Sequence, residues 1–372
     1  MNHVAILIPT IDKIGGAERQ VLLLAKALAM RGWQVTIIAL SGSGTDAATE
    51  LAEAGVRYLS LGMRKAWFDP RGWSRYVAWT TRNRPDIVHA HLPHATWFAR
   101  WVRLLAPVRV LVDTIHTSKA GGIGKRFGYR FSDWLSDRIT CVSNSVAASA
   151  IAAGMAQKAK LIVVPNGVVM PQRSNSSGSR PQASGFRPFQ WLAVGRLSPV
   201  KDYPTLLRAF AKLPGEPCLQ IIGSGSEEQY LRNLAVALRI EGRVQFAGFQ
   251  NDVQTFLTSA DGFVLSSLWE GLPMGVLEAS AAGLPVVATD GNGTREAMIP
   301  GSTGLIAPTA DEEALSEAMS TLMAMPLDRR LEMAAEGRQW IEENFSLSIV
   351  TDRWEKLYLQ LLEEHPRPSR IS

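Results

Sequence analysis

Two glutamates lie eight positions apart in an otherwise apolar stretch, "SSLWEGLPMGVLEASAAGLPVV". Glu270 belongs to a loop bounded by glycine and proline, and Glu278 is flanked by Val, Leu and Ala. A buried carboxylate is costly without a partner, so Glu278 must face a polar cleft or a dedicated donor. Hydroxyl groups of a bound ligand would satisfy it; the alternative is a glutamate on a solvated helix surface.

A helix start lies between the two glutamates. Pro273 suits the first helical turn, and the N–H groups of Met274, Gly275 and Val276 then point out of the helix. Such a terminus carries about half a positive charge and binds anions. Gly275 is unfavourable inside a helix, and we interpret it as room for a ligand.

Two cations follow an earlier strand of the same half. In "AVGRLSPVKDYPTLL" the strand ends at Gly195, and Arg196 and Lys201 lie on the loop before a helix. Ligands of doubly wound sheets bind at such strand ends, and a diphosphate accepts a guanidinium and an ammonium together. Gly223, in "GSGSEE", indicates a strand-to-helix turn near a ligand; the third glycine of the dinucleotide fingerprint is missing.

The first half offers a second anion-binding turn. Gly15 and Gly16 lie between the first expected strand and helix, where the backbone can approach a phosphate closely. His116, in "VDTIHTS", also follows a strand; a single histidine at such a position is more often structural than functional.

Two other motifs carry weaker signals. "AGGIGKRFG" resembles a phosphate-binding loop but lacks the hydroxyl that would hold magnesium. In "VHAHLPH", alternation places His89 and His91 on one face of a strand, with His94 nearby. These three histidines fit a structural role or the rim of a site better than a zinc site, which would need further ligands.

The elements that must position these residues alternate between strand and helix patterns along the whole chain. This alternation predicts an α/β protein with two doubly wound, mostly parallel sheets. The predicted domains are residues 1–171 and 189–350, joined by a Ser-, Gly- and Pro-rich linker at 172–188. The helical stretch in 351–372 has no strand after it and is expected to dock back toward the first domain.

Charge divides the chain unevenly. Residues 1–172 hold 21 Lys and Arg against 10 Asp and Glu, and the remainder holds 18 against 24. The basic first half favours an anionic partner. Its stretch 64–84 interleaves basic residues with tryptophans, which suits an anionic membrane surface, although the tryptophans can equally pack in the core. Nucleic acid ranks lower, because the acidic second half would repel it and no recognition motif is present.

Taken in order, these motifs resemble the retaining nucleotide-sugar glycosyltransferases of family 4, which have the GT-B fold: two Rossmann-like domains facing each other across a cleft. The resemblance spans the whole chain. The matching residues are Gly15-Gly16, His116, Pro165-Asn166-Gly167, Gly195-Arg196-Leu197 with Lys201, and Glu270 with Glu278.

The resemblance implies a role for each motif. Arg196 and Lys201 would hold the donor diphosphate and Glu278 the ribose. Glu270 and the backbone after Pro273 would hold the transferred sugar, which His116 would face from the other domain. It also implies transfer with retention and without a metal or other cofactor; no Asp-x-Asp pair, the usual metal-bridging motif, occurs in the chain.

We therefore expect transfer of a hexose or N-acetylhexosamine to a lipid-linked saccharide in surface-polysaccharide or glycolipid synthesis, with the sugar supplied in the UDP-linked form that the resemblance implies. The expected location is cytoplasmic, peripheral on the inner face of the cytoplasmic membrane. A nucleotide-sugar epimerase of the same fold and a non-catalytic nucleotide- or sugar-binding module are the alternatives.

Overall fold

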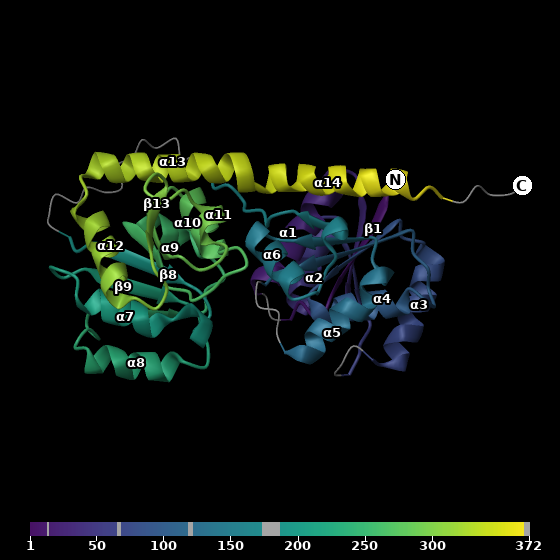
Figure 1. Ribbon diagram of the computed structural model, residues 1–372, viewed down its shortest axis with the longest axis horizontal. Helices are drawn as coiled ribbons and strands as arrows, with labels where there is room; N and C mark the ends of the chain where they lie inside the picture. Colours follow the sequence, from purple (N-terminus) through teal and green to yellow (C-terminus); the bar gives the residue numbers. More distant parts are fainter. Residues whose placement is uncertain (13–14, 65–67, 118–121, 173–186, 368–372) are drawn as a thin grey trace, which may run out of the picture. The chain divides into compact units, whose positions relative to one another are not determined.

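The computed structural model describes residues 1–12, 15–64, 68–117, 122–172 and 187–367. The chain forms two compact units (Figure 1). The first comprises Met1–Gly167 together with Leu347–Ser372, and the second comprises Val168–Ser346. Most of the expected linker, residues 173–186, lies outside the described residues.

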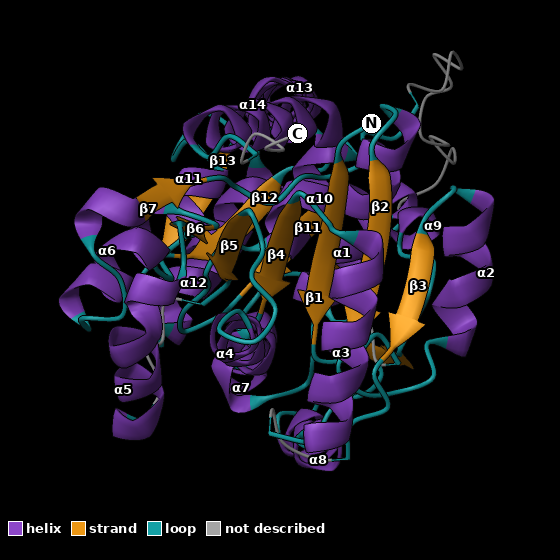
Figure 2. Cartoon of the chain, turned by 90° about the vertical axis from the view of Figure 1, so that its right-hand side faces the viewer, coloured by secondary structure: helices purple, strands orange, loops and turns teal. Residues whose placement is uncertain are grey.

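The first unit is built on a seven-stranded parallel sheet in the order β3-β2-β1-β4-β5-β6-β7. Figure 2 shows these strands side by side. The strands are β1 (His3–Ile8), β2 (Gln34–Ala39), β3 (Arg57–Ser60), β4 (Ile87–His91), β5 (Val110–Ile115), β6 (Arg138–Cys141) and β7 (Leu161–Val163).

Helices connect the strands of this sheet. They are α1 (Gly16–Met30), α2 (Thr45–Glu53), α3 (Pro70–Asn83), α4 (Pro93–Val102), α5 (Ile123–Ser132), α6 (Asn144–Ala152) and α14 (Leu347–Glu364), with the 3-10 turns η1 (Asp133–Leu135) and η2 (Lys158–Lys160). Strand β1 shows why both faces must be covered: Val4, Ile6 and Ile8 enter one buried apolar cluster, and Ala5 and Leu7 enter another.

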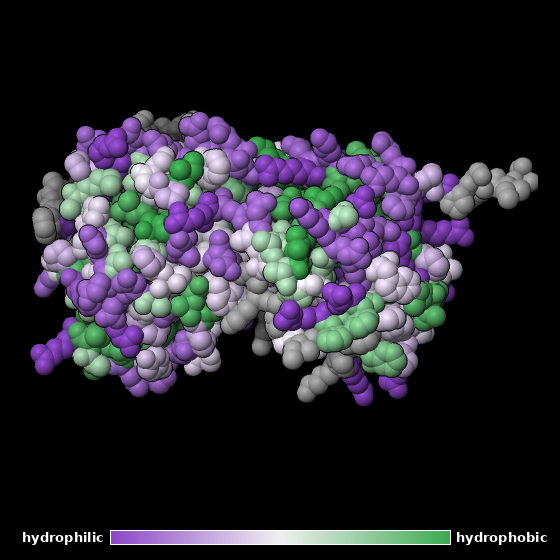
Figure 3. Space-filling view, viewed as in Figure 1, coloured by the Kyte–Doolittle hydropathy of each residue, from purple (hydrophilic) through white to green (hydrophobic). Residues whose placement is uncertain are grey.

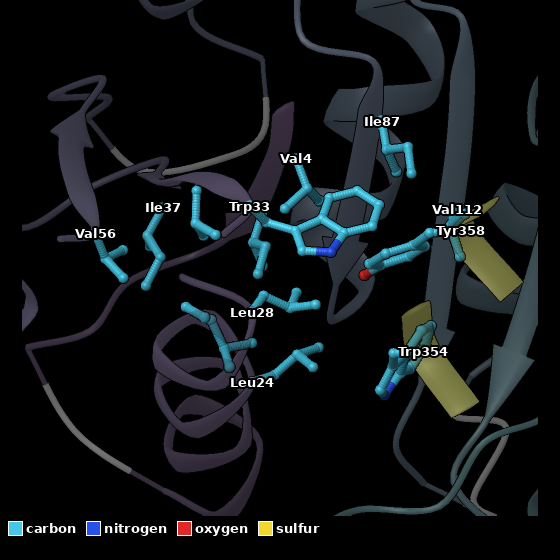
Figure 4. Packing of buried hydrophobic residues seen from close by; sticks show 14 of the residues in the cluster. Val4, Leu24, Leu28, Trp33, Ile37, Val56, Ile87, Val112, Trp354 and Tyr358 are labelled. Carbon is cyan, nitrogen blue, oxygen red and sulfur yellow. The ribbon is translucent and has the colours of Figure 1, made fainter. Parts of the chain in front are cut away.

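Helix α14, which contains most of the C-terminal stretch expected to dock back toward the first domain, belongs to the first unit. Its Trp354 and Tyr358 join the buried cluster that contains Leu28 of α1 and Trp33 (Figure 4). The rings of Trp33 and Tyr358 lie 5.6 Å apart. The first unit therefore closes its core with residues from the far end of the chain.

A buried chain of hydrogen bonds continues from α14 into the sheet. The Thr140 hydroxyl donates to the carbonyl oxygen of Asp113, so it accepts from Thr114, at 2.7 Å. Thr114 then accepts from Nε2 of His89, at 2.6 Å, and Nδ1 of His89 accepts from the Tyr358 hydroxyl, at 2.7 Å. This order satisfies every member and fixes His89 as the neutral tautomer protonated at Nε2.

The second unit is built on a six-stranded parallel sheet in the order β10-β9-β8-β11-β12-β13. The strands are β8 (Gln190–Val194), β9 (Cys218–Ile222), β10 (Val244–Gly248), β11 (Gly262–Leu265), β12 (Val286–Thr289) and β13 (Gly304–Ala307). The helices are α7 (Tyr203–Ala211), α8 (Glu228–Ala237), α9 (Gln254–Ser259), α10 (Met274–Ala281), α11 (Thr294–Ala297), α12 (Glu312–Ala324) and α13 (Leu327–Phe345), with the 3-10 turn η3 (Pro199–Lys201).

The alternation in the sequence identified eleven of these strands, and the two parallel α/β sheets agree with the predicted fold class. It did not identify β3 and β7, which are short edge strands whose residues are half-buried or exposed. Within the described residues, no helix has both the length and the apolar character needed to cross a bilayer.

Replacing Tyr358 with Phe removes the hydroxyl that donates to His89. The buried Nδ1 would lose its partner, and we expect the first unit to lose about 1–3 kcal/mol of unfolding free energy. Leu359→Ala, on the exposed side of α14, is the control and should cost about 0.5 kcal/mol or less. Urea unfolding of both variants measures the difference; equal losses would contradict the role of the hydroxyl.

Candidate functional site

The second unit brings Lys201 and Glu270 into contact, although they are 69 residues apart. Lys201 follows β8 and Glu270 follows β11; these strands are neighbours at the point where the strand order reverses direction. The Lys201 Nζ atom lies 2.6 Å from Glu270 Oε1. Ser267 donates its hydroxyl to the same oxygen, at 2.7 Å. The ion pair therefore occupies the position where doubly wound sheets bind their ligands.

Backbone contacts fix the loops that carry this pair. The Ser266 hydroxyl donates to the carbonyl of Lys201, at 2.7 Å, and the Leu268 N–H donates to Val200, at 2.9 Å. The Gly293 N–H, after β12, donates to the carbonyl of Glu270, at 3.3 Å. Three strand ends are thus tied together around one carboxylate and one ammonium.

Arg196 lies on the same loop as Lys201 but does not join the pair. Its side chain is exposed and makes no ion pair with the acidic residues that the structure describes. Arg196 and Lys201 together leave the loop after β8 with more positive than negative charge at the strand end. The role of Arg196 toward a diphosphate remains a prediction.

Close packing explains why glycine occupies position 223, which the sequence did not reveal. A Cβ atom at this position would lie 2.0 Å from the carbonyl oxygen of Gly195, and the backbone φ is +140°. The next residue, Ser224, accepts the Leu197 N–H at 3.0 Å. The glycine lets the loops after β8 and β9 pack against each other, and its part in binding a donor remains a prediction.

Helix α10 begins after Pro273, which is its N-cap residue. The Val276 and Leu277 N–H groups both donate to the Pro273 carbonyl, at 3.0 and 3.2 Å. The expectation that the Val276 N–H points outward is therefore wrong, because the helix itself uses that donor. Glu278, on this helix, is half-buried between buried neighbours.

Close packing also explains the glycine at position 275. A Cβ atom there would lie 2.9 Å from Cζ of Phe263, a fully buried ring on β11. The glycine lets the first turn of α10 approach the sheet. The structure thus accounts for the missing side chain without a ligand.

In the first unit, strand order reverses between β1 and β4, and the predicted residues follow these strands and β5. Gly15 is the N-cap of α1, and its N–H donates to the Glu18 side chain at 3.1 Å. Gly16 is the first residue of that helix. His91 ends β4 and His116 follows β5.

His91 and His116 form a direct hydrogen bond, with 2.9 Å between Nδ1 of His91 and Nε2 of His116. The rings of His89 and His91 lie 4.0 Å apart, which confirms that the two share a face of β4. Burial lowers the pKa of His116 to about 4 and that of His89 to about 3, and it holds the pKa of His91 well below its usual value. All three are neutral at pH 7.

A small pocket of about 20 Å³, room for about one water molecule, lies beside this pair within the first unit. Its polar lining comes from Gln20, His91, Thr114, His116 and Asn166. Nε2 of His91 is buried without a hydrogen-bond partner in the described structure. Sequence reasoning kept His91 only as a possible rim residue, because pairing with His116 depends on β4 and β5 being neighbours.

No group of three or more His, Cys, Asp or Glu side chains in the described ranges is arranged to hold a metal ion. The pairs described above instead offer hydrogen-bond donors and acceptors. In each unit these groups lie at the carboxyl ends of the central strands.

Comparison with known proteins assigns this arrangement to a class. The solved structure of Anabaena HepE in complex with UDP-glucose has a TM-score of 0.82 at 19% identity, over 96% of this chain and 99% of that one. The shared architecture is the GT-B fold. Residues 181–340 match the family model of glycosyl transferases group 1, and residues 14–170 match that of glycosyltransferase family 4.

Two curated relatives extend the match. The lipopolysaccharide core biosynthesis glycosyltransferase LpsE of Rhizobium meliloti is 31% identical over 363 residues, which are 95% of this chain and 97% of LpsE. The UDP-Gal:alpha-D-GlcNAc-diphosphoundecaprenol alpha-1,3-galactosyltransferase of Escherichia coli is 26% identical over 301 residues, which are 76% and 77% of the two chains. The chain belongs to the group 1 glycosyltransferases.

The neutral histidines make the stability of the first unit depend on pH. Below about pH 6.5 they take up protons in the unfolded chain but not in the folded one, so stability falls as the pH falls toward the folded pKa values. Each contributes about 1.4 kcal/mol per pH unit. Urea unfolding between about pH 7 and pH 5 should show this slope. In His116→Gln the slope should be smaller by up to about 1.4 kcal/mol per pH unit. An unchanged slope would contradict the burial of a neutral His116.

The contact of Gly275 with Phe263 can be separated from ligand binding. Gly275→Ala gains about 1 kcal/mol of helix propensity but overpacks the ring at a cost of about 1–3 kcal/mol. We expect Gly275→Ala alone to lower the free energy of unfolding. Added to Phe263→Leu, it should raise the free energy of unfolding relative to Phe263→Leu alone. A double-mutant cycle by urea unfolding measures this coupling, and zero coupling would refute the packing role.

Proposed function

We propose that this glycosyltransferase moves a hexose or N-acetylhexosamine from a UDP-sugar to a lipid-linked saccharide, with retention, during surface-polysaccharide or glycolipid assembly. The observation that carries the proposal is the Lys201–Glu270 pair at the reversal point of the second sheet. The UDP-glucose named for HepE supports the donor class. The names of the two curated relatives support a lipopolysaccharide or polyprenyl-linked acceptor.

The pair suits the diphosphate of a nucleotide sugar because Lys201 has more N–H groups than its bond to Glu270 uses. An ammonium has three N–H donors, and Lys201 uses one of them on Glu270. It can therefore donate to a phosphate oxygen while Glu270 keeps it oriented. Arg196, exposed on the same loop, adds a guanidinium that can take a second phosphate oxygen.

The remaining roles follow the same geometry. Glu278, half-buried on α10, would accept from the ribose hydroxyls, and Glu270 with the start of α10 would hold the sugar. As the sugar–phosphate bond breaks, negative charge grows on the leaving diphosphate. Arg196 and Lys201 would stabilise that charge, while the acceptor hydroxyl gives its proton toward the same phosphate. This reaction needs no metal or other cofactor.

The first unit would contribute the neutral His116 and the turn at Gly15 and Gly16. His116 uses Nε2 on His91, and a neutral ring can exchange hydrogen bonds with sugar hydroxyls without carrying charge. Gly16, at the start of α1, would offer backbone donors to a phosphate. We place the protein on the inner face of the cytoplasmic membrane, where a lipid-linked acceptor would be presented.

The two other candidate activities predict different products. An epimerase would convert one nucleotide sugar into another without an acceptor, and a binding module would turn over nothing. Radiolabelled UDP-sugars incubated with the protein and a membrane extract distinguish them, because only a transferase moves label into lipid. GDP- and ADP-sugars in parallel test the choice of nucleotide.

Glu270→Ala removes the acceptor shared by Lys201 and Ser267. We expect transfer to fall by about 10²–10³, while UDP still raises the melting temperature. Glu270→Gln, which keeps an oxygen acceptor, should lose less. Glu312→Gln, at an exposed lysine pair in the same unit, is the control. Full activity in Glu270→Ala, or loss of UDP binding with it, would contradict the assignment.

A further inference from the structure

Helix α5 carries large aromatic side chains on its outer face. Phe127, Phe131 and the following Trp134 are 53%, 61% and 63% exposed. The four-residue spacing places Phe127 and Phe131 on one side of α5, and Trp134 lies directly after the helix in η1. The rings of Phe127 and Phe131 stack, with centroids 5.2 Å apart and planes 17° from parallel. Aromatic area of this size is normally buried in a soluble domain.

The opposite face of α5 is packed tightly, so the outward direction of these rings is fixed. A Cβ atom at Gly128 would lie 2.9 Å from the Trp97 ring, and Tyr129 is buried. The carbonyl of Tyr129 accepts from the buried Arg100 guanidinium at 2.9 Å. The helix cannot roll to hide its aromatic face without breaking these contacts.

Basic residues accompany the exposed rings. Arg126 and Arg130 are exposed and Lys125 is half-buried. None of the three forms an ion pair with an acidic residue in the described part of the chain, and α5 itself contains no Asp or Glu. Figure 3 shows apolar and strongly polar atoms next to each other over the segment that Figure 1 labels α5. We call Lys125, Arg126, Phe127, Arg130, Phe131 and Trp134 the α5 patch.

The stretch 64–84, for which the sequence left membrane contact and core packing open, is arranged differently. Trp73 and Trp79 of α3 are half-buried and pack against the core cluster of that face. Trp73 meets Phe98 edge-on at 5.9 Å, and Trp79 meets His3 at 5.7 Å. Trp67 lies outside the described residues. The packing alternative applies to these two tryptophans, whereas Phe68 of the same stretch is 65% exposed. Helix α5 differs in that it presents two stacked exposed rings on one face.

We infer that the α5 patch docks onto an anionic lipid bilayer. Aromatic rings favour the interface between headgroups and acyl chains, and neighbouring cations are attracted to anionic headgroups. A second copy of this chain is a poorer partner, because a two-fold contact would place the same unpaired cations against each other. The inference rests on the proposed function, whose lipid-linked acceptor requires work at such a surface.

Co-sedimentation of the full chain with vesicles tests the inference. We expect binding to vesicles of phosphatidylcholine with phosphatidylglycerol and much less to phosphatidylcholine alone. Phe127→Ser/Phe131→Ser should weaken binding by on the order of tenfold for each ring. Arg126→Gln/Arg130→Gln, or added salt, should abolish the preference for anionic vesicles.

Tyr230→Ser/Val236→Ser is the matched control, since these side chains of α8 are 50% and 59% exposed. It should bind like the wild type. An equal loss in this control, unchanged binding in the α5 variants, or no binding by the wild type would each overturn the inference. So would light scattering that shows a dimer lost on Phe127→Ser/Phe131→Ser.

The melting-temperature rise caused by UDP, measured on every variant, separates this inference from the proposed function. We expect it to be unchanged in the α5 variants, because none of the six residues belongs to the donor site. Lost vesicle binding with intact UDP binding supports the patch. Vesicle binding by a wild type that does not bind UDP would refute the donor site alone.

Discussion

Parallel pairing of every strand is the constraint on which both candidate sites depend. In such a sheet all carboxyl ends lie along one edge, so side chains from separate loops meet wherever the strand order reverses. Lys201 and Glu270 meet for this reason after β8 and β11, whereas His91, at the end of β4, and His116, after β5, meet because those two strands are neighbours. The same sheet geometry thus positions an ion pair in one unit and a pair of neutral rings in the other.

The two pairs differ because their surroundings differ. Lys201 and Glu270 keep about a fifth of their side-chain area exposed, so water or a ligand can reach both charged groups. His91 is buried and His116 half-buried beside residues of α14, and the removal of solvent keeps both neutral. One unit is therefore suited to a changing charge, and the other to hydroxyl groups that must be oriented without charge.

Much of this arrangement could be predicted from the sequence. Apolar alternation located the central strands, and residue types located the loops at their ends. The family resemblance placed Lys201 and Glu270 around one donor, but the residues did not predict their direct contact, which depends on β8 lying beside β11. The sequence also suggested ligand-related reasons for Gly223 and Gly275, whereas a close carbonyl and a buried ring account for both. Their close neighbours come from other segments of the chain, which a local motif does not show.

The docking of α14 has a consequence for synthesis on the ribosome. The first 167 residues emerge before the whole of Val168–Ser346, yet their core contains Trp354 and Tyr358. During that interval the Trp33 ring and His89 lack the helix that covers them. The second unit can complete its fold while the first still exposes apolar surface. The unit whose synthesis begins second can therefore finish folding first.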